Sequence, residues 1–258
     1  MKLYLKYFKV HLKSELQYKA SFTMSFISNF IVFFGYYFTI LCLFDKFSNI
    51  NGFTMYDVLL TFGIVQFGFA FCEVFFRGID EFDDLIAEGN FDRLLLRPRS
   101  ILFQVVCDEI SAVRIARLLQ DVIVLIVAII NIDVSWDILK VLTLILMIIS
   151  SVFIFLSIFI ITASYCFITV KGLEFRNVLM YGAREMAQYP IGIFKKGFLI
   201  FFTCIVPIGF VNYYPLLYIL GRETNKLFIL SPLIAILYII PAILLFYKGM
   251  KRYTSVGS

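Results

Sequence analysis

Long apolar segments constrain the fold of this chain more than any other feature of its sequence. We place six of them, near residues 20–44, 55–76, 105–131, 138–170, 197–213 and 227–247. An α-helix needs about 20 apolar residues to cross the hydrocarbon core of a bilayer. Because 61% of the residues are hydrophobic and only 16% are charged, a soluble domain is excluded. The sequence predicts an all-α integral membrane protein with six transmembrane helices, forming a single domain over residues 1–258.

Basic side chains give the expected orientation, because cytoplasmic loops and tails retain lysine and arginine. With six spans, both termini share one side with two connecting segments, residues 77–99 and 171–196. That side holds most of the basic residues, namely Lys2, Lys6, Lys9, Lys13, Lys19, Arg77, Arg93, Arg97, Arg99, Lys171, Arg176, Arg184, Lys195, Lys196, Lys248, Lys251 and Arg252. The opposite side holds Lys46, Lys140, Arg222 and Lys226. We therefore expect both termini and both connecting segments in the cytoplasm.

The first 19 residues predict a separate amphipathic helix at the membrane surface. Lysines recur at positions 2, 6, 9 and 13, while apolar side chains recur at positions 5, 8, 12 and 16 on another face. Such an interfacial helix would lie along the inner leaflet with its lysines toward anionic lipid headgroups. The alternative is an ordinary helical extension of the first span.

The segment 77–99 combines a short amphipathic helix with an apolar cluster. From Arg77 to Glu88 the apolar residues at positions 79, 82, 85 and 86 share one helical face, and Gly89 provides a natural C-terminal stop. The next stretch, GNFDRLLLRPRS, places a phenylalanine and three leucines among charged side chains, and Pro98 prevents a smooth continuation into the third span. Such a cluster suits docking into a groove of another protein. The alternative is a solvated loop that only satisfies the orientation rule.

The chain before the last span predicts a re-entrant element. The fifth apolar segment is short, and the stretch NYYPLLYILGRETNK that follows it is interrupted by Pro215 and Gly221. Irregular backbone at membrane depth is tolerated only where protein covers it. We expect the turn of a re-entrant helix pair at Asn212, Tyr213, Tyr214 and Pro215, with the tyrosines at the headgroup level.

Ionisable side chains in and beside the apolar segments are functional candidates, because charge at membrane depth is costly. The predicted intramembrane polar network comprises Glu73, Asp108, Glu109, Arg114, Arg117 and Asp121. Arg117 and Asp121 are four residues apart on one predicted helix, where they can neutralise each other. Asp108, Glu109 and Arg114 suit the cytoplasmic interface, a face toward a partner chain, or a contact with substrate.

No segment carries a recognisable catalytic, nucleotide-binding or metal-binding motif. A phosphate-binding loop needs GxxxxGK[ST], and the nearest approach, at residues 192–197, is followed by Phe198. The single histidine and the five scattered cysteines form no metal-ligand pattern. We therefore expect that this chain is not an enzyme and holds no cofactor or metal. Membrane orientation explains the net charge of +5 better than nucleic-acid binding does.

Three motifs carry a resemblance to a known family: EGNFDRLLLRPRS at residues 88–100, PIGFVNYYP at 207–215 and GMKRYTSVGS at 249–258. With the order of the elements, they make the chain similar to permease subunits of type-2 ABC exporters, in the branch described as ABC-2 family transporter proteins. The resemblance covers the chain from end to end. It implies that the segment after the second span holds a coupling helix that contacts an ATPase. The coupling residues would be Phe91, Asp92, Arg93, Leu94, Leu95, Leu96, Arg97 and Pro98.

The resemblance also implies partners. Two separately encoded ATP-binding subunits would bind ATP and magnesium, and a second permease would complete the pathway, with a similar non-identical chain favoured over a homodimer. The expected function is export of an amphiphilic substrate, such as a drug, peptide or lipid, across the plasma membrane of a bacterium. A secondary transporter is an alternative, but it would be expected to show internal repeats with paired broken helices. A membrane scaffold without transport is the other alternative.

Overall fold

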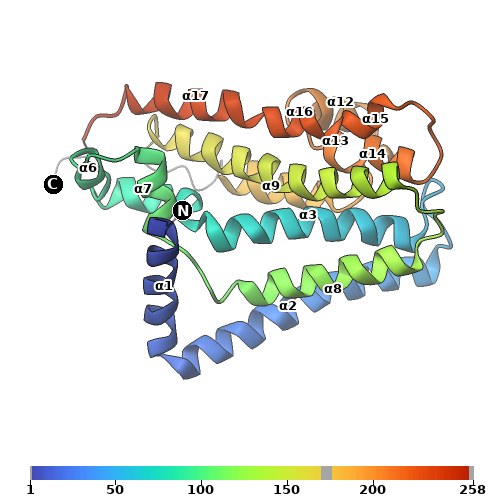
Figure 1. The fold of residues 1–258 in the computed structure, drawn as a ribbon, viewed down its shortest axis with the longest axis horizontal. Coiled ribbons are helices and arrows are strands. Elements are labelled where there is room, and N and C mark those ends of the chain that lie inside the picture. The colour runs from blue at the N-terminus through green and yellow to red at the C-terminus, as the bar shows by residue number, and fades with distance from the viewer. Residues whose placement is uncertain (1, 170–175, 256–258) are drawn as a thin grey trace.

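The computed structural model describes residues 2–169 and 176–255, and these fold into helices joined by short connections. Four long helices lie with their axes roughly aligned and their chain directions alternating (Figure 1). They are α2 (Lys19–Lys46), α3 (Met55–Phe75), α8 (Ile115–Asn131) and α9 (Ile138–Cys166). The final helical run beside them consists of α15 (Leu227–Leu230), α16 (Pro232–Leu237) and α17 (Ile239–Met250). Within the described residues the only β-type pairing is one isolated bridge. The predicted all-α class is confirmed.

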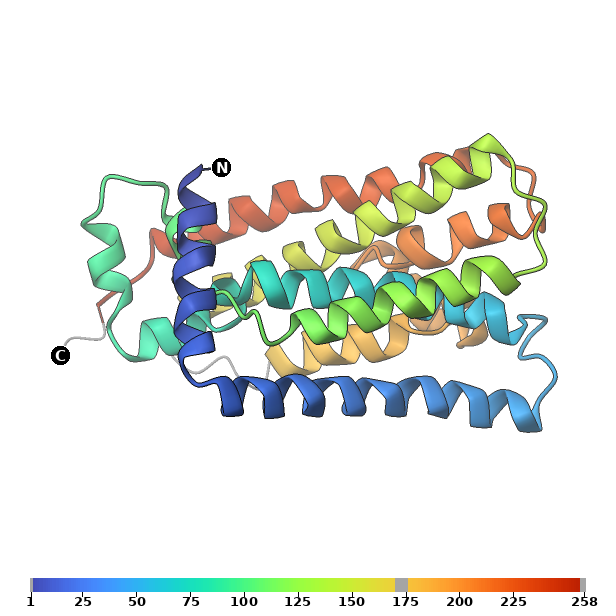
Figure 2. The same cartoon turned by 60° about the horizontal axis from the view of Figure 1, so that its bottom comes forward.

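The two ends of the bundle differ. Helix α1 (Lys2–Gln17) lies across the long axis at one end, which we call the near end (Figures 1 and 2). The near end also holds four short helices, α4 (Arg77–Asp80), α5 (Phe82–Ala87), α6 (Phe91–Leu95) and α7 (Ile101–Asp108). The connections 47–54, 132–137 and 220–226 lie at the opposite end, which we call the far end.

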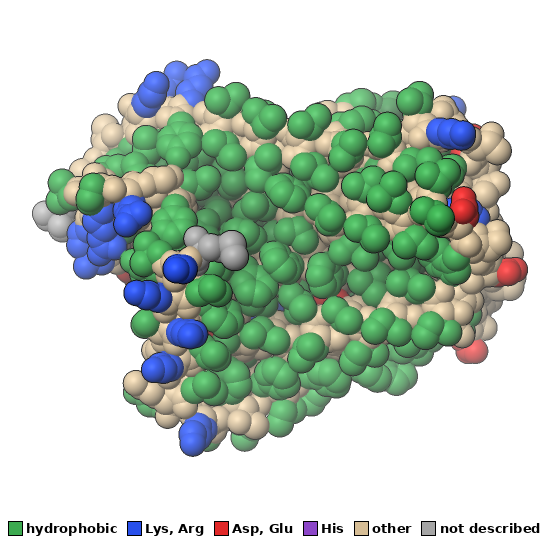
Figure 3. All heavy atoms as spheres, viewed as in Figure 1, with side chains coloured by type: hydrophobic (Ala, Val, Ile, Leu, Met, Phe, Trp, Pro, Cys, Tyr) green, Lys and Arg blue, Asp and Glu red, His purple; other side chains and the backbone are tan. Residues whose placement is uncertain are grey.

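Helix α1 is a separate element and not an extension of α2, because the chain turns sharply between them (Figure 2). The hydroxyl of Tyr4 donates to the carbonyl of Phe75 at 2.7 Å. The carboxylate of Glu15 accepts the N–H groups of Ala112 at 3.0 Å and Val113 at 3.2 Å, just before α8 begins. The predicted lysine row is exposed and follows α1 along the surface (Figure 3). The near end is thereby tied to the start of α8.

Helix α3 forms the centre of the bundle. Of its most apolar stretch 83% is buried, against 6% for α2. It packs against α8, α9 and α11 (Gly182–Ala187). Small residues allow the closest approach, because a Cβ added to Gly68 would lie 2.6 Å from the backbone carbonyl carbon of Ser151 on α9. Small residues at helix contacts are a common means of packing within membranes.

Length and composition single out four described helical runs that can cross a membrane: α2, α3, α9 and residues Leu227–Met250. A fifth is reached only if the bent pair made of α12 (Lys196–Cys204) and residues Gly209–Ile219 is counted as one span. Helix α8 has 17 residues, slightly fewer than the roughly 20 that a straight crossing needs. By this measure the described residues contain four or five spans of a multi-pass membrane protein.

Residues 176–193, which belong to the segment 171–196 that the sequence predicts to be cytoplasmic, run between the two ends of the bundle. At the near end Arg176 donates to Asp83 at 2.7 Å and to the carbonyl of Asp80 at 2.6 Å. At the far end the carbonyl of Ile193 accepts a hydrogen bond from Asn51 at 3.3 Å. Between these contacts lie the π-helix η1 (Asn177–Tyr181), α11 and the 3-10 turn η2 (Ile191–Ile193).

This course of the chain changes the expected location of two basic residues. Lys195 and Lys196 lie two and three residues after Ile193 and so belong to the far end, away from the basic residues on α1 and α6. Residues 171–175, with Lys171 among them, lie outside the described residues. The C-terminal part of the predicted cytoplasmic segment thus lies at the far end, and its side of the membrane stays a prediction.

The predicted re-entrant element coincides with a bent helix pair, whose bend lies earlier in the chain than the predicted turn. Helix α12 and the arm formed by α13 (Gly209–Asn212) and α14 (Tyr214–Ile219) meet at an angle of 95° across residues 205–208. The predicted turn, Asn212 to Pro215, lies within the second arm. Pro207 occupies the bend, whereas Pro215 lies in the first turn of α14, where a proline is tolerated because its missing N–H needs no partner.

Both arms of the bent pair open toward the far end. The first arm begins next to Ile193, and Arg222, just after the second arm, donates to the carbonyl of Gly52. Asn212 is buried in the second arm and donates to the carbonyl of Ala187 at 2.7 Å. The pair therefore enters and leaves the bundle at the same end.

We expect Gly68→Ala to destabilise the bundle by about 1–3 kcal/mol, since the added methyl group would push α3 and α9 apart. Gly35→Ala on α2 is the matched control, because a Cβ there would meet no atom within 4 Å. The test is the thermal unfolding midpoint of each detergent-purified variant. Equal midpoints for the two alanine variants would show that the contact between α3 and α9 is looser than described.

Candidate functional site

Helix α6 lies at the tip of the near end, and one of its faces is turned into the protein (Figure 1). Phe91 and Leu94 are only 0% and 4% exposed. The ring of Phe91 packs against those of Phe82 and Phe167 at centroid distances of 5.2 Å and 5.4 Å. The structure thus corrects the expectation that Phe91 and Leu94 face outward, because this short helix needs its apolar face to attach to the bundle.

The outward part of the predicted coupling segment is an apolar tip between basic side chains. Leu95 is 41% exposed and Leu96 is 86% exposed. Arg93, Arg97 and Pro98 are exposed around them, and Figure 3 shows basic side chains gathered at this end of the molecule. An apolar anchor ringed by charge is the chemistry of a protein-docking surface.

The two ends of α6 are fixed by its neighbours in the chain. Gly89 adopts a φ of +70° and ends the preceding helix, as predicted, in a conformation that favours glycine. The side chain of Gln104 on α7 donates to the carbonyls of Leu94 at 3.2 Å and Arg99 at 3.0 Å. These two bonds hold the chain on both sides of Pro98.

The C-terminal tail holds α6 from another side, a role that sequence reasoning missed. The ring of Tyr253 packs edge-to-face on Phe91 at 4.9 Å, and the hydroxyl of Ser255 donates to Asp92 at 2.5 Å. Both tail residues belong to the motif GMKRYTSVGS, whose last three residues lie outside the described residues. In the sequence, only the aromatic residue Tyr253 indicated that this tail packs against the protein.

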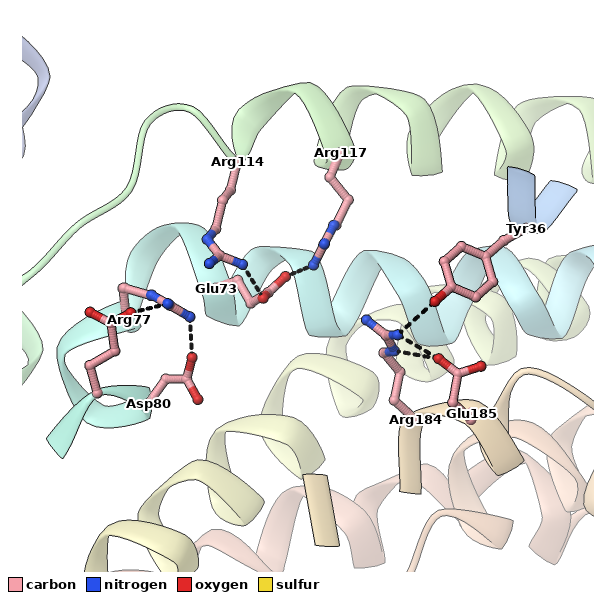
Figure 4. A network of polar contacts seen from close by, with 9 residues as sticks. Tyr36, Glu73, Arg77, Asp80, Arg114, Arg117, Arg184 and Glu185 are labelled. Atoms are coloured by element: carbon pink, nitrogen blue, oxygen red, sulfur yellow. Dashed lines mark hydrogen bonds and ion pairs between the residues drawn. The ribbon is translucent and has the colours of Figure 1, made fainter. Parts of the chain in front are cut away.

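Ion pairs connect the short helices of the near end with the bundle. Arg77 pairs with Asp80 and Glu81 (Figure 4). Arg176, at the start of the segment 176–193, pairs with Asp83 of α5. Helices α4 and α5 are thus tied to a part of the chain that reaches the far end.

Glu73 on α3 is the centre of a buried charge cluster. Its carboxylate pairs with both Arg114 and Arg117 at the start of α8 (Figure 4). Its side chain is only 1% exposed. Arg117 thus extends across the helix contact toward Glu73, so the expected partner Asp121 is not its only counter-charge. Asp121 is 1% exposed and makes no ion pair within the described part of the chain.

Arg184, which the sequence analysis assigns to a cytoplasmic segment, is a buried charge. It is 5% exposed and pairs with Glu185 at 2.5 Å (Figure 4). Its guanidinium lies over the rings of Phe69 at 4.8 Å and Tyr181 at 5.4 Å, an attractive geometry for a cation on an aromatic face. The orientation rule assigns such an arginine to the cytoplasm, although the apolar residues around it were a signal of burial.

The remaining members of the predicted polar network lie at the near end, outside the core. Asp108 is exposed at the end of α7. Burial raises the pKa of Glu109 to about 8, and a hydrogen bond to the carboxylate of Glu81 acts in the same direction, while Arg77 and Arg114 oppose the shift. Glu109 is therefore protonated at neutral pH and donates its proton to Glu81.

We expect the stability of the near end to fall as the pH rises through about 8. The folded state binds the Glu109 proton more tightly than the unfolded state, whose carboxyl has the ordinary pKa of 4.5. The contribution to the free energy of unfolding is therefore complete below 4.5 and is lost as the pH rises through the folded value. The measurement is the unfolding midpoint in detergent between about pH 6 and pH 9.

Two variants separate this effect from general alkaline destabilisation. Glu109→Gln keeps a donor toward Glu81 but cannot ionise, so its unfolding midpoint should fall less over the same pH range. Glu88→Gln removes a nearby carboxylate at the exposed end of α5 and should behave as the wild type does. An equal fall of the unfolding midpoint in wild type and in Glu109→Gln would contradict the role of the Glu109 proton in this pH dependence.

The site is thus an outward apolar tip that aromatic packing, tail contacts and ion pairs fasten to the bundle. The sequence profile of the family described as ABC-2 family transporter protein matches residues 30–257, which include this tip and its support. No curated protein and no solved structure matches the chain. The chain belongs to the ABC-2 transporter family and is a membrane permease of an ABC transporter.

Proposed function

We propose that this chain is the permease subunit of an exporter driven by separately encoded ATP-binding subunits, which dock on the tip of α6. The exposure of Leu96 carries this proposal, because 86% of a leucine is presented outward on a helix whose other face is buried. A solvated loop needs neither an apolar tip nor a buried support. Interface anchors have both, and basic neighbours such as Arg93 and Arg97 set orientation and register.

The contacts of α6 suit the transmission of motion. Phe91 and Tyr253 join it to the C-terminal tail after α17, and Gln104 joins it to α7. Arg176 and Asp83 join the preceding helix to the segment 176–193. Because these elements are packed together, a displacement of the tip by an ATPase moves the helices as rigid bodies instead of being absorbed locally.

The complete transporter contains two ATP-binding subunits, which bind ATP with magnesium and hydrolyse it, and a second permease. The peripheral position of α2, with 6% of its most apolar stretch buried, supports a partner or lipid on that face. We favour a similar but non-identical second chain over an identical copy. The substrate proposed is amphiphilic, a drug, peptide or lipid that crosses between the two permeases.

We infer six membrane crossings in a bacterial plasma membrane. They are α2, α3, α8, α9, the segment 176–193 and the run α15–α17, with the bent pair α12–α14 as a re-entrant element from the far side. The exposed lysines of α1 and the arginines around α6 favour a cytoplasmic near end. Both termini are then cytoplasmic.

Cysteine labelling tests this topology. In a cysteine-free background, we expect Lys196→Cys and Lys226→Cys to react with a membrane-impermeant maleimide from outside the cell, because both positions are exposed at the far end. Arg93→Cys should react only after permeabilisation. Labelling of Lys196→Cys from the cytoplasmic side alone would contradict the proposed fifth crossing and restore the arrangement expected from the sequence.

Aspartate substitutions test the docking tip. We expect Leu96→Asp to weaken ATPase binding on the order of 100-fold, since an unpaired charge in a dry interface costs several kcal/mol. Leu95→Asp, at a less exposed position, should act in the same direction. Arg99→Ala, beyond Pro98, should leave binding nearly intact. The measurement is co-purification of the ATPase with each permease, together with ATP-dependent export.

Leu94→Asp is the control for damage to the permease itself. Because Leu94 is 4% exposed, its replacement should lower the unfolding midpoint, whereas Leu96→Asp should not. Full ATPase binding by a folded Leu96→Asp variant would show that the tip is only a solvated loop. Transport without a bound ATPase would favour a secondary transporter, and no transport at all would favour a membrane scaffold.

A further inference from the structure

An apolar groove of about 790 Å³ opens on the side of the bundle between η1–α11 and α12. Val178, Gly182 and Met186 line one wall, and Phe198 and Phe201 line the other. This volume lies in the range of small-molecule binding sites, about 300–1,000 Å³. Such a site accommodates a ligand with an extended apolar part.

Two glycines keep the groove open. A Cβ added to Gly182 on α11 or to Gly197 on α12 would meet no atom within 4 Å. At Gly68, in contrast, the same addition would reach the backbone of the neighbouring helix. The glycines of the groove therefore leave space that a larger side chain could fill without disturbing the backbone around it.

The groove has one charged end. Lys195 is its only charged lining residue, and every other lining residue is apolar. Lys195 is exposed and lies two residues after Ile193, whose carbonyl bonds to Asn51 at the far end. From Met186 the α11 wall continues to Val178 over eight residues, or about 12 Å along a helix. The cation thus lies at the far end of the groove, and the apolar walls extend from it along α11 and η1.

We propose that this groove binds one acyl chain of an anionic phospholipid, whose phosphate pairs with Lys195. An apolar chain matches the walls, and a negative headgroup matches the lysine at the mouth, since lysines near the membrane surface attract anionic lipid. The site goes beyond the proposed ATPase-driven export and rests on it only for the position of the groove in the membrane. Binding itself requires no ATPase.

Tryptophan quenching tests the proposal in the full chain, reconstituted without an ATPase. Trp136 is the only tryptophan, so Trp136→Phe gives a silent background. Phe198→Trp then reports the groove, and Ile240→Trp on α17, where Ile240 is 53% exposed, reports bulk lipid. The vesicles are phosphatidylcholine containing either brominated phosphatidylglycerol or brominated phosphatidylcholine, since bromine quenches a neighbouring indole.

We expect the groove reporter to show about a fivefold preference for phosphatidylglycerol, the factor that one lysine near the surface gives toward anionic lipid. Ile240→Trp should show little preference. Lys195→Glu should abolish the preference of the groove reporter. Lys226→Glu, which changes another exposed far-end lysine outside the groove, should retain it.

Steric variants test occupancy independently of charge. Gly182→Leu should fill the groove and reduce quenching by both lipids, whereas Gly35→Leu, at an equally open position on α2, should not. An unchanged preference in Lys195→Glu would overturn the proposal. Absence of quenching by either lipid would also overturn it and would indicate that another protein chain covers the groove. Loss of ATPase docking in Leu96→Asp has no bearing on these results.

Discussion

Helix α3 is surrounded by other helices, so the charge that it carries must be satisfied within the protein. An isolated carboxylate at this depth is costly, and Glu73 obtains its counter-charges from Arg114 and Arg117 on α8. Because removal of one member would leave buried charge uncompensated, the cluster fixes how α8 lies against α3. The connection before α8, which Glu15 of α1 holds through two backbone N–H groups, depends on the same arrangement.

An aromatic cluster gives the near end a second kind of stability. The ring of Phe82 on α5 packs against Phe91 on α6, Phe167 after α9 and Phe246 on α17, with centroid distances of 5.1–5.6 Å. Edge-to-face packing of this kind adds about 0.5–1.5 kcal/mol per pair to the burial of the rings. The neighbouring helices α5 and α6 thus form one body with the end of α9 and with α17, which are distant in sequence, and this is why α6 can be short and still have a fixed direction.

The sequence predicted those parts of the fold whose signals are local. Continuous apolar runs predicted α2, α3, α9 and the last helical run. The lysine spacing predicted α1, and Gly89 predicted the end of the helix before α6. The course of residues 176–193 from one end of the bundle to the other was missed because Arg184 interrupts the apolar pattern, and the rings that surround it come partly from Phe69 on α3. The orientation rule counts a basic residue without regard to burial, and so it placed this arginine in the cytoplasm.

The candidate site was located from the sequence, but its orientation was not. A helix of five residues is too short for its periodicity to show which leucine faces inward. The burial of Leu94 and the exposure of Leu96 depend on the aromatic cluster and on Gln104, which are tertiary features. The bend of the re-entrant pair was misplaced for a similar reason, because Pro207 and Pro215 are equal as local signals and only the surrounding helices decide which one bends the chain.

Helix α1 also relates the bundle to the thickness of the bilayer. It meets the last residue of α3, Phe75, through Tyr4, and the 21 residues of α3 rise about 31 Å, close to the hydrocarbon thickness of an average bilayer, about 30 Å. If α1 lies in the headgroup layer, as its lysine spacing predicts, a tilt of the bundle is one way to match a thinner bilayer. Because α1 is fastened across the bundle axis, such a tilt would lift one of its ends out of the lipid. For such a placement of α1, a change in acyl-chain length would act on α6 and its neighbours through the tilt of the bundle, without any bound molecule.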